Sequence, residues 1–263
     1  MKQLVLHSVV PVRREDKETA EQTTQLLFGE TCEVLDQTDR WLKITNETDG
    51  QQGWVDKKML SPISEEEYKS YISSDRSALV CYPMAYAVSE GNNQTFPLTA
   101  GTRLANYNNG HFSILGASFR IDPAMVSTPK QLTAESLQHT ARFFLNIPYL
   151  WGGKNCLGMD CSGFVQVLMS LFGKQLPRNA SEQAKIGEEI GFLQESQAGD
   201  LVFFDHHTAK TDSTNICHVG ILLSQDTVMH CSGRVKVEHI DSNGIISQQT
   251  GEYTHDLRVI KRF

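Results

Sequence analysis

The sequence has no long hydrophobic run and no cysteine pair with the spacing of a Cys-x-x-Cys motif. Its 263 residues contain no apolar stretch near the roughly 20 residues that a membrane-spanning helix needs. The six cysteines include no Cys-x-x-Cys pair, and six in a chain of this length are too few for a disulfide-dense fold. We therefore expect no membrane span, and thiols that are reduced and mostly buried.

Positive charge is also scarce. Lys and Arg number 24 against 31 Asp and Glu, so the formal net charge at pH 7 is −7. Nucleic acids and acidic membranes bind basic surfaces, and the composition argues against both as partners. Residues 1–7 hold too short an apolar stretch for a signal peptide. We expect a cytoplasmic monomer, or a periplasmic or exported protein if a signal peptide has been removed.

Turn residues divide the first half of the chain into short strands. Apolar and polar side chains alternate at residues 40–45, and the spacing of such segments predicts a small β-barrel over residues 1–62. A glycine-to-aromatic spacing that starts at Gly29 recurs weakly at Gly101. This repeat predicts a second small barrel over residues 63–129.

The pattern changes to mixed helix and strand at about residue 130. Before it, residues 61–73 are rich in Glu and Ser and are interpreted as a connector. Farther on, apolar residues from Cys161 to Phe172 recur at i, i+3, i+4, i+7, i+8 and i+11, which predicts a buried helix. Asp160 stands at its N-cap position and Gly173 after its end.

Cys161 therefore occupies the first turn of a buried helix. The unpaired N–H groups and the dipole there favour a thiolate, and they could also hold an oxyanion. A small apolar residue at the start of a core helix is the structural alternative. A cysteine nucleophile also requires a base, so the histidines decide between the two interpretations.

Two later strands carry such a base. Residues 217–223 and 227–232 predict a hairpin, in which a three-residue turn pairs Leu223 with Thr227. His218 and His230 then lie on one face of the sheet, as a base and the group that orients it. Cysteine and histidine side chains also bind zinc, so these three residues could in principle form a zinc site. Zinc sites usually contain two ligands close together in the sequence, and no such pair occurs here, so we expect no metal.

Several ordered motifs over residues 130–263 resemble those of the NlpC family of cell-wall endopeptidases. They are Tyr149-Leu150-Trp151-Gly152-Gly153, Asp160-Cys161-Ser162-Gly163-Phe164, Pro177-Arg178, Gly199-Asp200-Leu201-Val202-Phe203-Phe204, His218-Val219-Gly220-Ile221 and the later His230. The resemblance implies an α+β chain of two SH3-like β-barrels followed by a papain-like catalytic domain. It also implies that Cys161 is the nucleophile, His218 the base and His230 the third polar residue.

The resemblance also suggests residues that line the substrate site. Positions matching the family's substrate residues are Tyr149, Asp160 and Ser162. Asp160 is then a carboxylate for the free amine of the peptide, a helix cap, or both. Arg178 is either a partner for a substrate carboxylate or a solvated loop residue, and Ser181 is a weaker candidate. In the first barrel, Glu21 and Trp54 are candidates for closing the groove, against an exposed Glu and a core Trp.

The two barrels ahead of the domain make the chain similar to the family's γ-D-glutamyl-L-diamino acid endopeptidases. This implies hydrolysis of the γ-D-glutamyl–diamino acid bond in peptidoglycan stem peptides with a free N-terminal L-Ala, which releases L-Ala-D-Glu without a cofactor. The diamino acid, diaminopimelate or Lys, stays open. The alternatives are a wall-binding module with an inactive catalytic domain, and an amidase or acyltransferase of the same fold.

Overall fold

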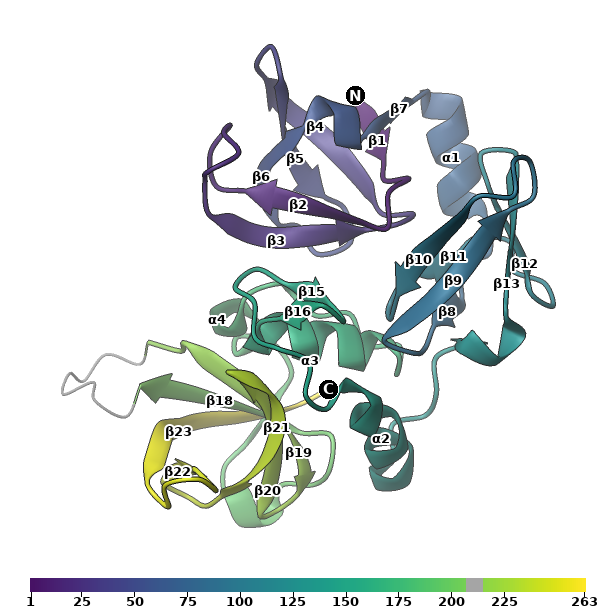
Figure 1. Ribbon diagram of the computed structural model, residues 1–263. Helices are drawn as coiled ribbons and strands as arrows, with labels where there is room; N and C mark the ends of the chain where they lie inside the picture. Colours follow the sequence, from purple (N-terminus) through teal and green to yellow (C-terminus); the bar gives the residue numbers. More distant parts are fainter. Residues whose placement is uncertain (207–214) are drawn as a thin grey trace. The chain divides into compact units, whose positions relative to one another are not determined.

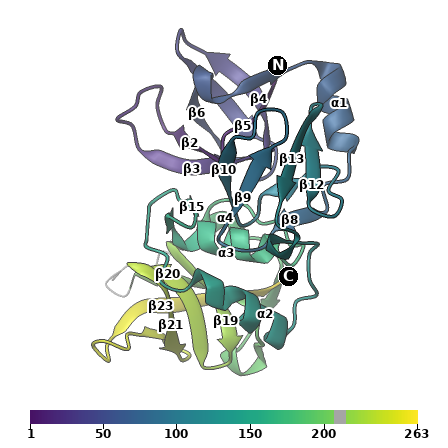
Figure 2. The same ribbon diagram turned by 45° about the vertical axis from the view of Figure 1, so that its right-hand side comes forward.

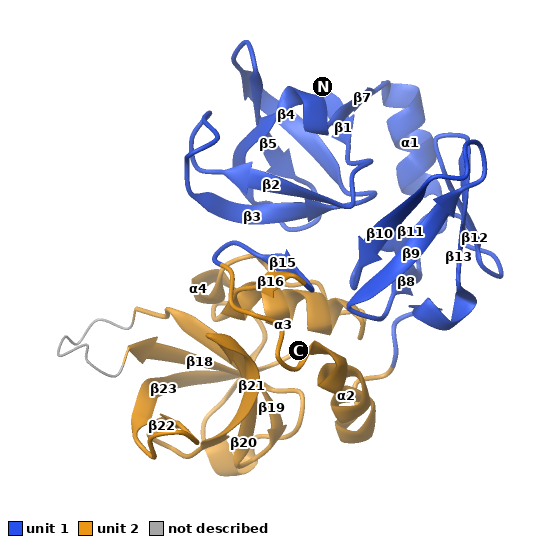
Figure 3. Cartoon of the chain, viewed as in Figure 1, with its two compact units in different colours: residues 1–130, 151–156 blue, residues 131–150, 157–263 orange. Residues whose placement is uncertain are grey.

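Antiparallel strands outweigh helices in this α+β chain. The computed structural model describes residues 1–206 and 215–263, and Figure 1 labels its elements. The chain divides into two compact units, coloured in Figure 3: unit 1 is Met1–Lys130 with Trp151–Cys156, and unit 2 is Gln131–Leu150 with Leu157–Phe263. Within the described ranges, no helix is both long and apolar enough to cross a membrane.

The N-terminal part of unit 1 is an antiparallel sheet. Its strands are β1 (Lys2–Leu4), β2 (Val9–Arg13), β3 (Gln22–Leu27), β4 (Thr31–Gln37), β5 (Trp41–Asn46), β6 (Gln52–Asp56) and β7 (Ser61–Ile63), in the order β3-β2-β6-β5-β4-β1-β7. The alternation predicted at residues 40–45 corresponds to β5, whose Leu42 and Ile44 are buried. Val10 and Val12 of β2 join the same cluster, so each strand buries one face.

A second group of strands in unit 1 lies between residues 78 and 127. They are β8 (Ala78–Val80), β9 (Met84–Ser89), β10 (Thr95–Thr99), β11 (Arg103–Leu104), β12 (His111–Ile114), β13 (Ala117–Ile121) and β14 (Val126–Ser127). They pair as two small antiparallel sheets, in the orders β10-β9-β13-β12 and β11-β8-β14. That this region is a second SH3-like barrel stays a prediction.

A helix lies within the segment interpreted as a connector. Residues 61–73 form β7 and α1 (Glu65–Ser73). The Ser64 hydroxyl accepts the Glu67 N–H at 3.2 Å, and the Glu67 carboxylate accepts the Ser64 N–H at 2.7 Å. This reciprocal capping box satisfies two backbone donors at the start of the helix.

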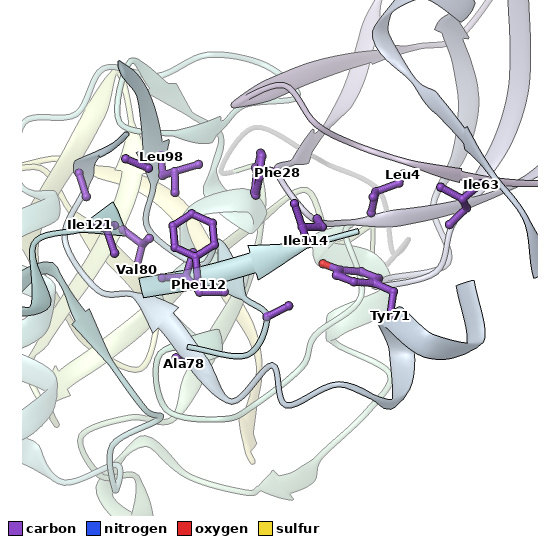
Figure 4. Close-up of a cluster of buried hydrophobic side chains, with 14 residues drawn as sticks. Leu4, Phe28, Ile63, Tyr71, Ala78, Val80, Leu98, Phe112, Ile114 and Ile121 are labelled. Carbon is purple, nitrogen blue, oxygen red and sulfur yellow. The ribbon is translucent and has the colours of Figure 1, made fainter. Parts of the chain in front are cut away.

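One hydrophobic cluster joins the two strand-rich parts of unit 1. Figure 4 shows Phe28, from the turn after β3, together with Phe112 of β12 and Tyr71 of α1. The rings of Phe28 and Phe112 meet edge to face with centroids 6.2 Å apart. The Tyr71 hydroxyl donates to the Gly29 carbonyl at 2.8 Å. The two predicted barrels therefore share a core and are not independent modules.

The short segment Trp151–Cys156, just before the helix that begins at Cys161, belongs to unit 1. It contains β15 (Lys154–Asn155). Gln25 Oε1 accepts both the Lys154 N–H and the Asn155 side-chain amide, each at 2.8 Å. The buried Lys154 ammonium lies 3.6 Å from the carboxylates of Glu30 and Asp49. Gly152 has φ 73°, and a Cβ there would lie 2.6 Å from the Gln22 backbone oxygen.

Unit 2 is a twisted antiparallel sheet with helices. Its elements are α2 (Ala134–Ala141), β16 (Gly158–Met159), α3 (Cys161–Ser170), α4 (Ala180–Gln183), β17 (Glu188–Ile190), β18 (Leu201–His206), β19 (His218–Ser224), β20 (Thr227–Ser232), β21 (Arg234–Ile240), β22 (Gly244–Ile246) and β23 (Tyr253–Arg262). The sheet order is β17-β23-β18-β19-β20-β21-β22, and β22 also pairs with β23, which closes the ring. Helix α3 packs on β19 and β20, as Figure 2 shows.

All six cysteines are free thiols, as the sequence predicts. Cys32, Cys161 and Cys231 are buried, and the other three are partly exposed. The expectation that most are buried therefore holds for only half of them.

Lys154→Met should destabilise unit 1 by about 3 kcal/mol, because it leaves two carboxylates without their buried cation. Lys58→Met is the matched control: Lys58 also pairs with an acid, but its side chain is 69% exposed, so we expect a change of at most about 1 kcal/mol. Urea unfolding followed by tryptophan fluorescence reports unit 1, which contains all three tryptophans. Equal losses in the two variants would contradict a buried ion network.

Candidate functional site

Helix α3 begins at Cys161, as the sequence predicts. Asp160 is its N-cap, and its Oδ1 accepts the Gly163 N–H at 2.7 Å. Every residue from Cys161 to Met169 is buried. Gly173 follows the helix with φ 75°, a conformation that glycine adopts without strain. The cap and the apolar spacing thus fix the nucleophile candidate at the start of a core helix.

The Cys161 thiol lies beside the first residues of β19. Its sulfur accepts the backbone N–H groups of Val219 and Ser162. Val219 directly follows His218. This hydrogen bond therefore places the sulfur next to the base candidate in the described structure. The Cys161 residue is only 7% exposed.

Burial overrides the helix terminus in setting the charge of this thiol. The sequence pattern predicts a stabilised thiolate, but burial and the neighbouring Asp160 charge raise the pKa of Cys161 to about 12. The two N–H donors and Arg178 act in the opposite direction and only partly compensate. Burial, with His230 and His255, also holds the pKa of His218 well below its usual value. At neutral pH the site therefore contains a thiol and a neutral imidazole.

The predicted hairpin brings the two histidines together. Gly220 pairs with His230, as the assumed register requires, and the His218 Nε2 lies 2.8 Å from His230 Nδ1. The turn itself differs from the prediction. Ser224, and not Leu223, pairs with Thr227, because a register shift follows Leu222 and leaves two residues in the turn.

Two groups beside the histidines were not anticipated from the sequence. The Glu238 carboxylate of β21 lies 2.8 Å from His230 Nε2. The His255 ring of β23 stacks on the His218 ring, with centroids 4.2 Å apart and planes inclined by 25°. Burial lowers the pKa of His255 to about 4, so this third ring is neutral above that pH. Glu238 comes from the strand directly after β20, whereas His255 comes from β23, near the end of the chain.

Arg178 is buried and paired. It is 1% exposed, and its guanidinium binds Asp160 Oδ1 at 2.9 Å and Oδ2 at 2.5 Å. It also donates to the Ser162 hydroxyl at 2.9 Å. The alternative of a solvated loop arginine is therefore wrong, because a bidentate ion pair holds the guanidinium inside. Asp160 is a helix cap and an ion-pair partner, and its predicted contact with a substrate amine stays a prediction.

Of the other substrate-site candidates, Tyr149 lies near Cys161 and Asp160, whereas Ser181 is exposed on a short helix. Tyr149 is 37% exposed, and burial together with the charges of Cys161 and Asp160 raises the pKa of its hydroxyl. The proximity of these groups is consistent with a place at the site. Ser181 is exposed on the short helix α4, and no described contact ties it to Cys161.

The two candidates from the first predicted barrel, Glu21 and Trp54, lie in unit 1. The Glu21 carboxylate accepts the indole N–H of Trp151 at 2.7 Å and pairs with Arg14 at 2.9 Å. Trp54 is half-buried on β6, paired with Lys43 and Arg13. Their role in closing a groove stays a prediction. Among residues 1–206 and 215–263, no group of three or more His, Cys, Asp or Glu side chains is arranged to hold a metal ion.

Comparison with known proteins connects both units to described families. The NlpC/P60 family matches residues 146–254, and the bacterial dipeptidyl-peptidase SH3 domain matches residues 12–60. A γ-D-glutamyl-L-lysine dipeptidyl-peptidase of Bacillus subtilis is 30% identical over 220 residues, which cover 79% of this chain and 71% of the relative. A protein of the same name from Bacillus cereus is 26% identical over 254 residues, 87% of this chain and 73% of the relative.

A solved structure shares the fold over the full length. The crystal structure of an NlpC/P60 family protein from Bacillus cereus superposes with a TM-score of 0.82, covering 100% of this chain and 99% of the other. The sequences are 19% identical, so this likeness concerns the fold alone.

Alkylation of Cys161 by iodoacetamide should be slow at neutral pH and should rise about tenfold per pH unit between pH 6 and 9, because the thiolate fraction grows with pH below a pKa near 12. Peptide mass spectrometry measures the rate at this residue. The denatured chain is the control, since the thiol of an unfolded cysteine has a pKa of about 8.5. A folded-state rate that is constant from pH 6 to 8 would mean that a thiolate–imidazolium pair already exists.

Proposed function

The chain belongs to the NlpC/P60 family, and from this we propose that it is a cysteine peptidase that cleaves the γ-D-glutamyl–diamino acid bond of peptidoglycan stem peptides. The substrate is a peptide with a free N-terminal L-Ala, and the products are L-Ala-D-Glu and the remainder that begins with the diamino acid. Cys161 is the nucleophile, His218 the general base and His230 the residue that orients it.

The hydrogen bond between His218 and His230 beside Cys161 is the main support for this proposal. A buried pair of imidazoles at 2.8 Å next to a helix-start thiol is the base-and-orienter arrangement that nucleophilic catalysis requires. A wall-binding module would require none of these three side chains. This argues against the alternative of an inactive catalytic domain.

The reaction begins with proton transfer. His218 is neutral and Cys161 is a thiol, so the imidazole takes the sulfur proton as the sulfur attacks the γ-glutamyl carbonyl carbon. The carbonyl oxygen becomes an oxyanion, which N–H groups at the start of α3 can stabilise. The C–N bond then breaks, the His218 imidazolium gives its proton to the leaving amine, and a thioester to Cys161 is left.

Water completes the cycle. His218 removes a proton from the water as its oxygen attacks the thioester carbonyl, and the sulfur leaves and recovers the proton. The net change is addition of one water across the amide bond. Neither step requires a cofactor.

The names of the two Bacillus relatives support the choice of bond. Both are called γ-D-glutamyl-L-lysine dipeptidyl-peptidases, and the matched segments span more than two thirds of each. A dipeptidyl-peptidase removes two residues from a free N-terminus, which matches release of L-Ala-D-Glu. An amidase or acyltransferase of the same fold would instead act on a sugar-linked or lipid substrate.

We predict that the protein cleaves L-Ala-γ-D-Glu-L-Lys, L-Ala-γ-D-Glu-diaminopimelate, or both, and that liquid chromatography with mass spectrometry detects L-Ala-D-Glu as a product. Cys161→Ala should abolish cleavage, and His218→Ala should reduce kcat by about 10²–10⁴-fold, the usual contribution of proton transfer. Cys81→Ala is the matched control, because the hydrogen bond of that thiol goes to the Met125 carbonyl and not to a residue assigned to the site, so the rate should not change. Intact activity in Cys161→Ala would refute the assignment.

Acetylation of the L-Ala nitrogen should lower kcat/KM at least about a hundredfold, because a cost of about 3 kcal/mol accompanies loss of a charge-assisted contact. The comparison uses free and N-acetylated L-Ala-γ-D-Glu-L-Lys at equal enzyme concentration. Rates within about threefold of each other would show that the amine is not recognised, and would move the assignment to an enzyme that cuts the intact wall.

A further inference from the structure

Glu238 lies directly behind the two histidines of the site. It is 3% exposed, and its Oε2 accepts the His230 Nε2–H at 2.8 Å. The Lys236 ammonium lies 3.0 Å from the same oxygen, and the Gln248 N–H reaches Oε1 at 3.3 Å. Burial alone would raise the pKa of this carboxyl, but the hydrogen bonds from His230 and Lys236 lower it to about 2. Glu238 is therefore an ionised carboxylate at any working pH.

The charge of Glu238 determines where the ring protons are. A carboxylate can only accept, so His230 carries its proton on Nε2. Burial keeps the pKa of His230 low, so the ring is neutral and its Nδ1 has a free lone pair. That nitrogen must then accept from His218 Nε2, 2.8 Å away. His218, also neutral, is left with a bare Nδ1 as its only basic nitrogen.

Building on the proposed function, we propose that Glu238 is a positioning residue of the catalytic site, which fixes the tautomers of His230 and His218 so that His218 Nδ1 can take the Cys161 proton. The carboxylate binds His230, which in turn binds His218, so it acts on the base through two hydrogen bonds in series. In a neutral imidazole only one nitrogen is basic, so the wrong tautomer places a proton where the base must accept one.

The charges around the histidines also set the pH at which the base is neutral. His218 lies against His230 of β20 and His255 of β23, and burial and the charges of His230, His255, His206 and Lys236 lower its pKa. Glu238 raises the pKa of His230, whereas Lys236 lowers it. Removing one charge or the other should therefore move the titration of the histidine pair in opposite directions, which a merely structural role for Glu238 would not produce.

The first test measures the pH dependence of kcat/KM on a cleaved γ-D-glutamyl tripeptide. Glu238→Gln should lower kcat at least about tenfold with KM changed less than about threefold, and should move the acid limb to lower pH. Lys236→Met should move the acid limb to higher pH. Glu252→Gln, an exposed acid in the same unit, is the control and should match wild type. Wild-type kcat and acid limb in Glu238→Gln would overturn the proposal.

The second test does not depend on activity. Nitrogen NMR of 15N-histidine-labelled protein at pH 8 shows which ring nitrogen carries the proton. Wild type should have Nε2–H on both His218 and His230, and Glu238→Leu should populate Nδ1–H forms. Unchanged tautomers in Glu238→Leu, or Nδ1–H on His218 in wild type, would contradict the proposal. If wild type cleaves no γ-D-glutamyl peptide, the proposed function fails, while this measurement still decides the role of Glu238.

Discussion

The antiparallel pairing of β19 with β20 is the constraint on which the whole site depends. It sets Gly220 opposite His230 and makes His218 a diagonal neighbour of that histidine. A Cβ on Gly220 would lie 2.6 Å from a Val228 methyl and 3.1 Å from the His230 Cβ, so only glycine permits this close approach. The same strand presents the Val219 N–H to the Cys161 sulfur. One strand thus connects nucleophile, base and orienter.

Desolvation by burial determines the charge states of the nucleophile and the base. It raises the pKa of Cys161 and lowers that of His218, so the reacting pair is neutral before substrate binds. Each of the two flanking carboxylates has a cation as its ion-pair partner: Asp160 has Arg178, and Glu238 has Lys236. The neutral pair therefore lies between two compensated ion pairs. Proton transfer within it creates charge only when the reaction requires it.

Local sequence patterns predicted the parts of the site that depend on neighbours along the chain. The apolar spacing after Asp160 located α3, and the hairpin pattern placed His218 and His230 on one face. Glu238 was missed because it reaches His230 from the next strand. A turn at Gly233 would have predicted that partner, since β21 pairs Lys236 with His230 and leaves Glu238 diagonal to it.

Contacts between distant parts of the chain, and burial, could not be predicted from local sequence patterns. His255 meets His218 only because β23 runs beside β18, a pairing that joins distant parts of the chain. The raised thiol pKa depends on burial in three dimensions, which helix position alone does not indicate. The burial of Arg178 follows likewise from its contact with Asp160. By contrast, Ser64 and Glu67 have the spacing of a capping box, so the start of α1 could have been predicted from the sequence.

Covalent catalysis by Cys161 requires an acyl-enzyme intermediate, which can be trapped. We predict that acid quenching within milliseconds of mixing with L-Ala-γ-D-Glu-L-Lys leaves an L-Ala-D-Glu acyl group on the peptide that contains Cys161, detected by mass spectrometry. The adduct should disappear on treatment with hydroxylamine, which cleaves thioesters. An adduct on another cysteine, or turnover with no acyl-enzyme when thioester hydrolysis is rate-limiting, would contradict the account.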